Sequence, residues 1–488
     1  MISVYSVRNL DTITFNLMTE TGRRERKIFQ NVTIIDTAND GLAMGRCEDG
    51  RIILVRHAVP GDIADVMVVE KRKGMLVTVP TFFHEQSSFR TAPFCQHFGI
   101  CGGCKWQHMT YEAQLHFKEK TVHDAYQRIG GLDTSILQPI VAAPRQQYYR
   151  NKLEFTASDQ RWLTSDEMNH REAIQDASGV GFHLPGSFDK VLDLHHCHLQ
   201  TDPSNAIRLN IKQVCQENHW VFFDLKNKTG FLRNIILRNN LAGDWMVVIV
   251  VGQDDRSAIE TIVDSITVQF PEVKSVYSCL NTKVNDSIHD LEVKLEYGAK
   301  TIVETLGHVQ FHIGPKSFFQ TNSQQAARLY SLAKKMAALK ATDHVYDLYC
   351  GVGSLGLFMA DQCAHVVGIE QIPEAIEDAR ANAQLNQITN AEFEVGQVER
   401  LLDPQFILAH GRPDVIITDP PRAGMHPDVI AHLVAASPSR IVYVSCNPST
   451  QARDIKALSG FYNIASAVPV DMFPHTHHIE CIALLQRG

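Results

Sequence analysis

Short alternating runs of hydrophobic and polar residues occupy positions 31–86, and many of the hydrophobic residues are β-branched. The turn sequences Asn-Asp-Gly, Glu-Asp-Gly and Pro-Gly-Asp separate these runs. Such alternation is typical of half-buried strands, and glycine-rich turns join neighbouring strands. We therefore predict that residues 31–86 form five short strands and an OB-like β-barrel. Barrels of this kind often bind nucleic acid, although a purely structural β-domain would show the same pattern.

The pattern becomes mixed over residues 87–310. A predicted helix spans residues 110–130, with Thr110 as its N-cap and Gly130 as its stop. Apolar runs such as DWMVVIVVG and a second helical segment near residues 256–270 follow. We expect residues 87–310 to form an α+β central domain.

From residue 311 onward, apolar runs alternate with helical segments. The runs are HVYDLYC, HVVGIE, AEFEVG, DVIITDPP and RIVYVSC. This β-α-β alternation predicts a parallel, doubly wound, Rossmann-like α/β domain over residues 311–488. Ligands of such sheets bind outside the carboxyl ends of the strands, so polar residues that end these runs are candidates for a site.

Length and charge narrow the class of protein. The chain has 488 residues, which is too many for one compact core, so several domains are expected. Its formal net charge of −8 argues against a protein that coats nucleic acid with its whole surface, but it leaves room for a local basic face. We find no run of 18 apolar residues and no secretion signal, and the 11 cysteines suit a reducing compartment, so we expect a cytoplasmic protein without membrane contact. We interpret residues 1–30 as a leader outside the folded domains.

Three cysteines stand close together at the start of the predicted central domain. Cys95, Cys101 and Cys104 form a C-x5-C-x2-C array, and the two glycines of its CGGC part allow both thiolates to face one centre. Zinc and iron–sulfur clusters usually need four ligands, so a fourth must come from elsewhere, and Cys197 is our first choice. The alternatives are the neighbouring histidines His195, His196 and His198. Spacing alone does not separate a cluster from zinc, which is the commoner partner of such pairs.

The sequence YDLYCGVGSLGLFMA contains a turn that is suited to ligand binding. Gly351 and Gly353 allow a tight turn and close approach of a ligand to the backbone, although a lone Gly-x-Gly is weak evidence. Glu370 ends the next strand, 23 residues after Asp347, where an acid can hold a ribose diol in NAD enzymes and in S-adenosylmethionine (SAM) enzymes. Asp419 begins the sequence DPPRAG at the same predicted edge, where it can meet SAM or the target base. A dehydrogenase has no use for that feature.

Cys446 ends the run RIVYVSC, directly before an Asn-Pro turn. A cysteine at the end of a strand is more often a small core residue, but a SAM-like pocket and a DPPR sequence beside it favour a nucleophile. Carbon 5 of uracil is a poor nucleophile, and thiolate addition to carbon 6 creates an enolate that can attack an electrophilic methyl group. A base must then remove the proton from carbon 5, and Glu480 at the head of the final strand is our first choice. The alternatives are the preceding histidines His475, His477 and His478.

The set CGGC, DLYCGVGSLGL, DPPRAG, VSCNPST and HHIE resembles the RNA uracil-5-methyltransferases, from about residue 31 to residue 488. The resemblance implies that Cys446 is the nucleophile, that Glu480 is the base and that residues 31–86 form a TRAM domain, an OB-like RNA binder. It also implies the SAM contacts Gln320, Tyr349, Gly351, Ser354, Glu370, Gln397 and Asp419. Ser354 and Gln397 stand where related sequences often carry Asn.

The resemblance extends to the cysteines and the substrate. Cys95, Cys101, Cys104 and Cys197 match the [4Fe–4S] ligands of the branch that methylates 23S ribosomal RNA, which reverses the preference for zinc. We therefore expect SAM and a [4Fe–4S] cluster as cofactors, 23S rRNA as the substrate and a monomeric enzyme. The transfer RNA branch, whose bacterial members usually lack both the barrel and the cluster, is the alternative.

Two other classes stay open. An amino-group methyltransferase carries (N/D)PP(Y/F) where this chain has DPPR, and it needs no Cys446. A non-enzymatic RNA-binding factor with an iron–sulfur module would not bind SAM. Binding of RNA needs cations near the phosphates, and we expect three basic groups to converge on one side. The groups are Arg23, Arg24, Arg26 and Lys27; Lys71, Arg72 and Lys73; and Arg150 with Lys152.

Overall fold

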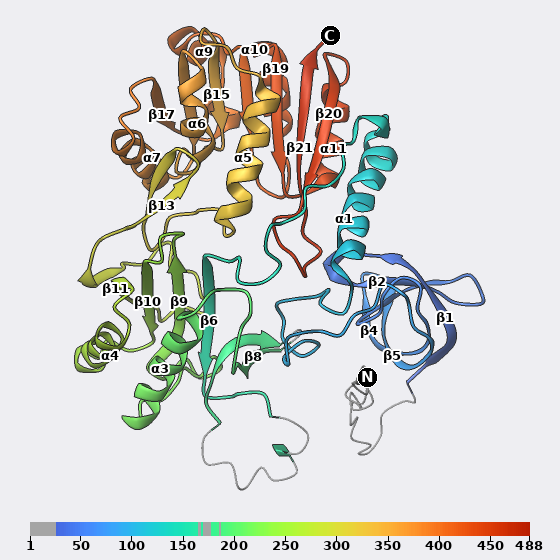
Figure 1. Ribbon diagram of the computed structural model, residues 1–488, viewed down its shortest axis with the longest axis vertical. Helices are drawn as coiled ribbons and strands as arrows, with labels where there is room; N and C mark the ends of the chain where they lie inside the picture. The colour runs from blue at the N-terminus through green and yellow to red at the C-terminus, as the bar shows by residue number, and fades with distance from the viewer. Residues whose placement is uncertain (1–25, 164–166, 169–176, 185–186) are drawn as a thin grey trace, which may run out of the picture.

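The computed structural model describes residues 26–163, 167–168, 177–184 and 187–488, so most of the predicted leader lies outside the described residues. A small barrel, a unit with a central sheet and an α/β unit with a second sheet follow one another along the chain (Figure 1). Within the described residues, no helix combines the length and the apolar character that a membrane span requires.

The N-terminal unit is a closed five-stranded barrel in the order β1-β2-β3-β5-β4, as predicted. Alternate side chains of its strands face inward and form a small core of their own. The strands are β1 (Ile28–Thr37), β2 (Ala43–Arg46), β3 (Ile52–Val55), β4 (Ile63–Arg72) and β5 (Met75–Glu85). The first strand therefore begins inside the segment that the sequence assigned to the leader.

The helix α1 (Tyr111–Ala125) connects the barrel to the rest of the molecule. Thr110 caps it as predicted, because its side chain accepts a hydrogen bond from the backbone N–H of Ala113 at 3.3 Å. The chain stays helical through a π turn, Tyr126–Gly130, and ends at Gly131, whose φ of 64° needs a glycine. The predicted stop at Gly130 is thus one residue early. Figure 1 shows α1 running beside α11 (Pro448–Leu458), against which it packs.

The central unit is a seven-stranded sheet in the order β12-β11-β10-β9-β6-β7-β8. Helices α3 (Ser204–Glu217) and α4 (Arg256–Gln269) cover one face with their apolar sides, as expected for an α+β domain. The strands are β6 (Lys152–Ser158), β7 (Gly179–Leu184), β8 (Ser187–Asp193), β9 (Leu232–Asn239), β10 (Trp245–Val251), β11 (Val273–Leu280) and β12 (Lys294–Gly298).

The C-terminal unit is a second seven-stranded sheet in the order β17-β16-β15-β18-β19-β21-β20. Its first five strands are parallel and correspond to the five predicted runs, whereas β21 and β20 close the sheet in antiparallel fashion. The strands are β15 (His344–Leu348), β16 (His365–Glu370), β17 (Ala391–Val395), β18 (Val415–Thr418), β19 (Arg440–Ser445), β20 (Tyr462–Val470) and β21 (Glu480–Arg487). The helices are α5 (Ser323–Ala337), α6 (Ser354–Met359), α7 (Pro373–Leu385), α8 (Val398–Leu401), α9 (Pro404–His410), α10 (Pro427–Ala436) and α11. This confirms the predicted Rossmann-like fold.

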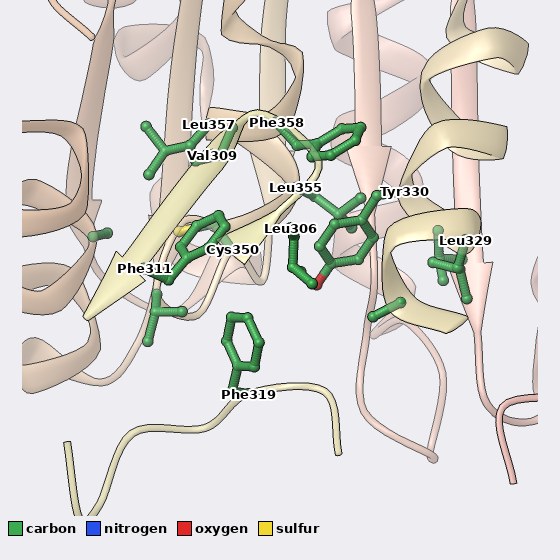
Figure 2. Packing of buried hydrophobic residues seen from close by; sticks show 14 of the residues in the cluster. Leu306, Val309, Phe311, Phe319, Leu329, Tyr330, Cys350, Leu355, Leu357 and Phe358 are labelled. Atoms are coloured by element: carbon green, nitrogen blue, oxygen red, sulfur yellow. The ribbon is translucent and has the colours of Figure 1, made fainter. Parts of the chain in front are cut away.

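A hairpin of β13 (Ile302–Leu306) and β14 (Val309–Ile313) joins the two sheets. Its buried face packs on the C-terminal unit, where Leu306 and Phe311 belong to the same apolar cluster as Phe358 (Figure 2). A methyl group at Gly307 would approach the Phe358 ring to 2.9 Å, so the turn of the hairpin lies directly on α6. The boundary drawn between residues 310 and 311 therefore falls inside β14.

Candidate active site

The predicted site residues gather where the parallel strands end. Glu370 is the last residue of β16, Asp419 follows β18, and Cys446 follows β19. The chain order of the strands reverses between β15 and β18, and the crevice at such a switch point is the usual ligand site of an open α/β sheet. The prediction that these side chains share one edge is confirmed.

The two glycines of the turn after β15 have different surroundings. Gly351 has φ +55°, and a methyl group added there would meet nothing within 4 Å. Gly353 has φ +76°, but a methyl group there would lie 3.0 Å from the Phe393 ring and 3.1 Å from Ala379. The Glu370 carboxylate accepts a hydrogen bond from the Gly351 N–H at 3.2 Å, which fixes the turn. Gly351 therefore borders open space for a ligand, whereas Gly353 serves internal packing.

Two carboxyl groups lie at the switch point itself. Asp347 in β15 is fully buried and accepts a hydrogen bond from the Gly356 N–H at 2.7 Å, while its second oxygen has no partner in the described part of the chain. The pKa of Asp347 is raised to about 7, mainly by burial and also by the charges of Asp419 and Glu370. Burial also raises the pKa of Asp419 to about 7. This cluster disfavours negative charge and is therefore suited to a cationic ligand.

Cys446 and Glu480 lie at the matching ends of the neighbouring strands β19 and β21. The antiparallel ladder pairs Ser445 of β19 with Cys481 of β21, so Cys446 and Glu480 occupy the next pair of positions outward. Directly opposite residues of an antiparallel pair have Cβ atoms roughly 5 Å apart, on the same face. The cysteine is half-buried, and the chain turns away behind it because Asn447 caps α11. The strand-end thiol and the proposed base are thus neighbours.

The electrostatic surroundings of Cys446 are mainly negative. The pKa of its thiol is raised to about 11, mainly by burial and also by the charges of Glu480 and Asp419, whereas Arg422 lowers it. Burial likewise raises the pKa of Glu480 well above its ordinary value, with a further contribution from Asp419. The Arg422 side chain is held by the ring Nδ1 of His478 at 3.3 Å. Arg422 is therefore the cation that can stabilise a thiolate here, and the DPPR motif was the signal for it that sequence reasoning left unused.

The three histidines before Glu480 are weaker candidates for the base. Burial lowers the pKa of His475, His477 and His478 to about 4 in each case. An imidazole with so low a pKa is a poor proton acceptor, whereas a carboxylate with a raised pKa is a stronger one than usual. The electrostatics therefore favour Glu480.

Comparisons with known proteins agree with this geometry. A profile of the tRNA (uracil-5-)-methyltransferase family matches residues 285–488. A Porphyromonas gingivalis protein described as an RNA methyltransferase is 47% identical over 464 residues, which cover 93% of this chain and 99% of that protein. A similarly described Bacteroides thetaiotaomicron protein is 45% identical over 452 residues, which cover 92% and 99%. This chain belongs to the RNA (uracil-5-)-methyltransferase family.

A solved structure supports the same family. The tRNA (uracil-54, C5)-methyltransferase of Pyrococcus abyssi, in complex with S-adenosyl-L-homocysteine (SAH), aligns with a TM-score of 0.71 at 30% identity. The alignment covers 93% of this chain and 100% of the Pyrococcus chain. Like its family, this chain is a SAM-dependent RNA methyltransferase, which excludes the non-enzymatic alternative.

Of the remaining predicted SAM contacts, Tyr349 and Ser354 flank the glycine turn, whereas Gln320 and Gln397 come from other segments of the chain. Gln397 lies two residues after the end of β17 at the N-cap position of α8, and its side-chain oxygen is buried without a partner among the described residues. Tyr349 has φ +63° at the start of the turn. Gln320 precedes α5, where its carbonyl accepts a hydrogen bond from the Asn151 side chain at 2.9 Å. The Ser354 hydroxyl is already hydrogen-bonded to the Tyr330 hydroxyl at 2.8 Å, so it is the least free of the set.

The cysteine loop lies between the barrel and α1, against the central sheet. The pKa of Cys101 is raised to about 12, mainly by burial and also by the neighbouring thiols of Cys104, Cys197 and Cys95. The four thiols are thus close enough to interact electrostatically. However, no group of three or more His, Cys, Asp or Glu residues in the described ranges is arranged to hold a metal ion. The ring of His195, one of the alternative ligands, stacks on His97 with the ring centroids 5.8 Å apart.

The predicted basic groups are only partly available to RNA. Arg23 and Arg24 lie outside the described residues. Arg72 pairs with Asp40 at 2.8 Å, and Lys152 pairs with Glu154. Arg150 lies over the Phe473 ring and borders a cleft of about 270 Å³ together with Arg145. The positive charge is thus distributed over the barrel and over the cleft beside the central sheet.

Proposed function

We propose that this enzyme transfers a methyl group from SAM to carbon 5 of a uridine in RNA through a covalent adduct with Cys446. The observation that carries the proposal is the position of Cys446 opposite Glu480, beside the crevice where the parallel strands end. An enzyme that methylates an amino group needs neither of these two side chains.

The chemistry follows from these positions. The Cys446 thiolate adds to carbon 6 of the uracil, and the electrons of the 5,6 double bond move to form an enolate. Carbon 5 then attacks the methyl group of SAM, and the departing S–C bond electrons stay on sulfur as SAH is formed. The Glu480 carboxylate removes the proton from carbon 5, the double bond re-forms, and the thiolate leaves.

The negative surroundings of Cys446 serve the methyl donor. SAM carries a positive sulfonium, and the carboxyl groups of Asp347, Asp419 and Glu370 are placed to favour a cation at the strand ends. A bound cation offsets the charges that raise the pKa of Cys446, so the thiolate becomes more accessible when the donor is present. We propose the SAM contacts Gln320, Tyr349, Gly351, Ser354, Glu370, Gln397 and Asp419.

We propose that Cys95, Cys101, Cys104 and Cys197 hold a [4Fe–4S] cluster. The thiols interact electrostatically, and the donor set is the all-thiolate set that such clusters require. Four cysteines leave no iron open for chemistry, so we assign the cluster a structural role.

We propose 23S rRNA as the substrate of a monomeric, cytoplasmic enzyme, with transfer RNA as the alternative. The argument for 23S rRNA is the combination of barrel and cysteine loop. The argument for transfer RNA is that the Pyrococcus enzyme, named for uracil 54 of tRNA, matches this chain along its whole length. The barrel therefore does not by itself separate the two substrates.

The test is methyl transfer from labelled SAM to separated 23S, 16S and transfer RNA from cells that lack this enzyme, followed by nucleoside analysis. We expect 5-methyluridine in 23S rRNA, none with Cys446→Ala, and a trapped protein–RNA adduct with Glu480→Gln. 5-Methyluridine in transfer RNA would keep the chemistry and overturn the substrate. Methylation that survives Cys446→Ala would refute the mechanism.

A further inference from the structure

The connection between β20 and β21, residues 471–479, is unusual for a hairpin. Hairpin loops mostly have two to five residues and lie on the surface. This one is longer, most of its residues are buried, and its ends are the paired residues Val470 and Glu480. In Figure 1 it is the red loop that descends from the sheet toward the start of α1. The position of Glu480 therefore depends on how this connection is held.

Five consecutive carbonyl groups of the 471–479 connection each accept a hydrogen bond from a donor elsewhere in the chain. The donors come from α1, from α5 and its cap, from Tyr149 shortly before β6, and from the end of the cysteine loop. The pairs are Gln325 to Asp471 at 3.0 Å, Asn322 to Met472 at 2.9 Å, Lys118 to Phe473 at 3.0 Å, Tyr149 to Pro474 at 3.0 Å, and the Lys105 and Trp106 N–H groups to His475 at 2.8 and 3.0 Å. The backbone is fixed at successive residues by separate parts of the fold.

The strongest tie runs to α1. Lys118 and Asp471 form an ion pair of 2.6 Å in which both side chains are fully buried. The Tyr111 hydroxyl donates to the second oxygen of Asp471 at 2.8 Å. Gln114, one helical turn from Lys118, accepts a hydrogen bond from the His475 N–H at 2.8 Å. Three residues of α1 thus hold the connection at Asp471, Phe473 and His475.

The backbone of the connection is also strained. His475 has φ 64°, in the left-handed region that a histidine rarely adopts. Such a conformation persists only where the surrounding structure over-determines it. Here the surrounding structure is Gln114, which accepts the hydrogen bond from the His475 N–H, and the N–H groups of Lys105 and Trp106, which donate to the His475 carbonyl.

From these contacts we infer that Lys118 is a positioning residue for the methyl-transfer reaction: through Asp471 it fixes the 471–479 connection, and thereby the carboxylate of Glu480. Lys118 touches neither RNA nor SAM and acts only through the connection. The inference rests on the proposed function, in which Glu480 removes the proton from carbon 5. It predicts that loosening this tie impairs proton removal more than the earlier addition of Cys446.

The test separates these two steps. RNA with 5-fluorouridine at the target forms the adduct and accepts the methyl group, but fluorine cannot be removed by a base, so trapping reports only the early steps. RNA with tritium at carbon 5 reports proton removal by release of label. In Lys118→Met we expect trapping at the wild-type rate and tritium release that is slower by about 10- to 100-fold, with the methylated adduct accumulating on ordinary RNA.

Two further variants guard against misfolding. Tyr111→Phe removes one hydrogen bond to Asp471, and the double variant Lys118→Met with Asp471→Asn removes both charges together. The matched control is Lys120→Met, on the same helix, whose ammonium pairs with Asp36 and Asp124 and does not contact the connection. We expect the first two to show the same selective slowing and the control to behave as wild type.

The outcomes discriminate between the two proposals. If Glu480→Gln accumulates the adduct while the Lys118 and Tyr111 variants slow both steps equally, or neither step, the positioning role is wrong and the proposed function stands. If Glu480→Gln releases tritium at the wild-type rate, the assignment of the base fails, and with it the basis of this inference.

Discussion

Substitution of the two glycines in the strand–helix turn should have opposite effects on stability and on SAH binding, so the two variants form a matched pair. Both Gly351 and Gly353 have positive φ angles, so an alanine at either position costs roughly 1–2 kcal/mol of backbone strain. At Gly353 the new methyl group would also press on the Phe393 ring at 3.0 Å and on Ala379 at 3.1 Å, and both residues are buried. Overpacking of this kind costs about 1–3 kcal/mol more.

We therefore expect Gly353→Ala to lose about 2–5 kcal/mol of stability and Gly351→Ala about 1–2 kcal/mol. Binding of SAH reverses the order. The methyl group of Gly351→Ala enters the open space above the turn, where we place the ligand, and should weaken SAH binding at least about tenfold, or about 1.4 kcal/mol. Folded Gly353→Ala should bind SAH nearly as well as wild type, because its methyl group points into the core.

Urea unfolding of the two variants measures the first difference, and calorimetric titration with SAH measures the second. Equal unfolding midpoints would show that the contacts of Gly353 with Phe393 and Ala379 carry no energetic weight. Wild-type affinity of Gly351→Ala for SAH would refute the position of the ligand over the turn, and the proposed SAM contacts would then need revision.

Three further predictions follow from the charges and the thiols. Burial holds the pKa of Asp347 near 7 in the folded state, against about 3.9 when unfolded, so ionisation of this carboxyl opposes folding as the pH rises through this range. Asp347→Asn should therefore stabilise the protein at pH 8 by up to about 4 kcal/mol and leave its stability unchanged at pH 4. Unfolding experiments at both pH values measure this difference. The rate of Cys446 alkylation in the free enzyme should rise about tenfold per pH unit from pH 7 to pH 10, because the pKa of the thiol is about 11. An alkylation rate that stops rising below pH 8 would contradict this pKa. Cys101→Ser should lose bound iron on anaerobic purification while the matched variant Cys215→Ser, a buried thiol of the apolar core, retains it; equal iron content would refute the cluster.

The sequence was sufficient for the parts of the fold that local pattern encodes. The five apolar runs became the five parallel strands, because a buried parallel strand needs a continuous apolar stretch. The meeting of Glu370, Asp419 and Cys446 at one edge then followed, since all parallel strands end on the same side. Thr110 was predictable as a helix cap because capping depends on a few neighbouring residues.

The parts that escaped prediction depend on contacts between distant segments. Nothing near Lys118 in the sequence indicates that its partner is Asp471, in the last hairpin of the chain. Gly351 and Gly353 look equivalent in the sequence, and only the packing of Phe393 separates the packing glycine from the one that borders the ligand space. The boundary predicted at residue 310 fell inside a hairpin, because the sequence of β14 is equally suited to a strand of the central or of the C-terminal domain. Its packing with Phe358 shows that it belongs with the C-terminal domain.

In this mechanism, the residues that select the RNA must differ from the residues that carry out the chemistry. In the proposed mechanism Cys446 and Glu480 act on carbons 6 and 5, which every uridine has, and a uridine must leave the base stack before a thiol can reach carbon 6. The strand-end crevice therefore reads a single nucleotide. Discrimination between RNAs falls to the surfaces around it, such as the barrel, where Phe82 is 59% exposed, and the cleft that Arg145 borders. The alignment with the Pyrococcus enzyme covers 93% of this chain and all of that one, so we expect a difference in substrate between the two to come mainly from side chains on these surfaces rather than from an added domain.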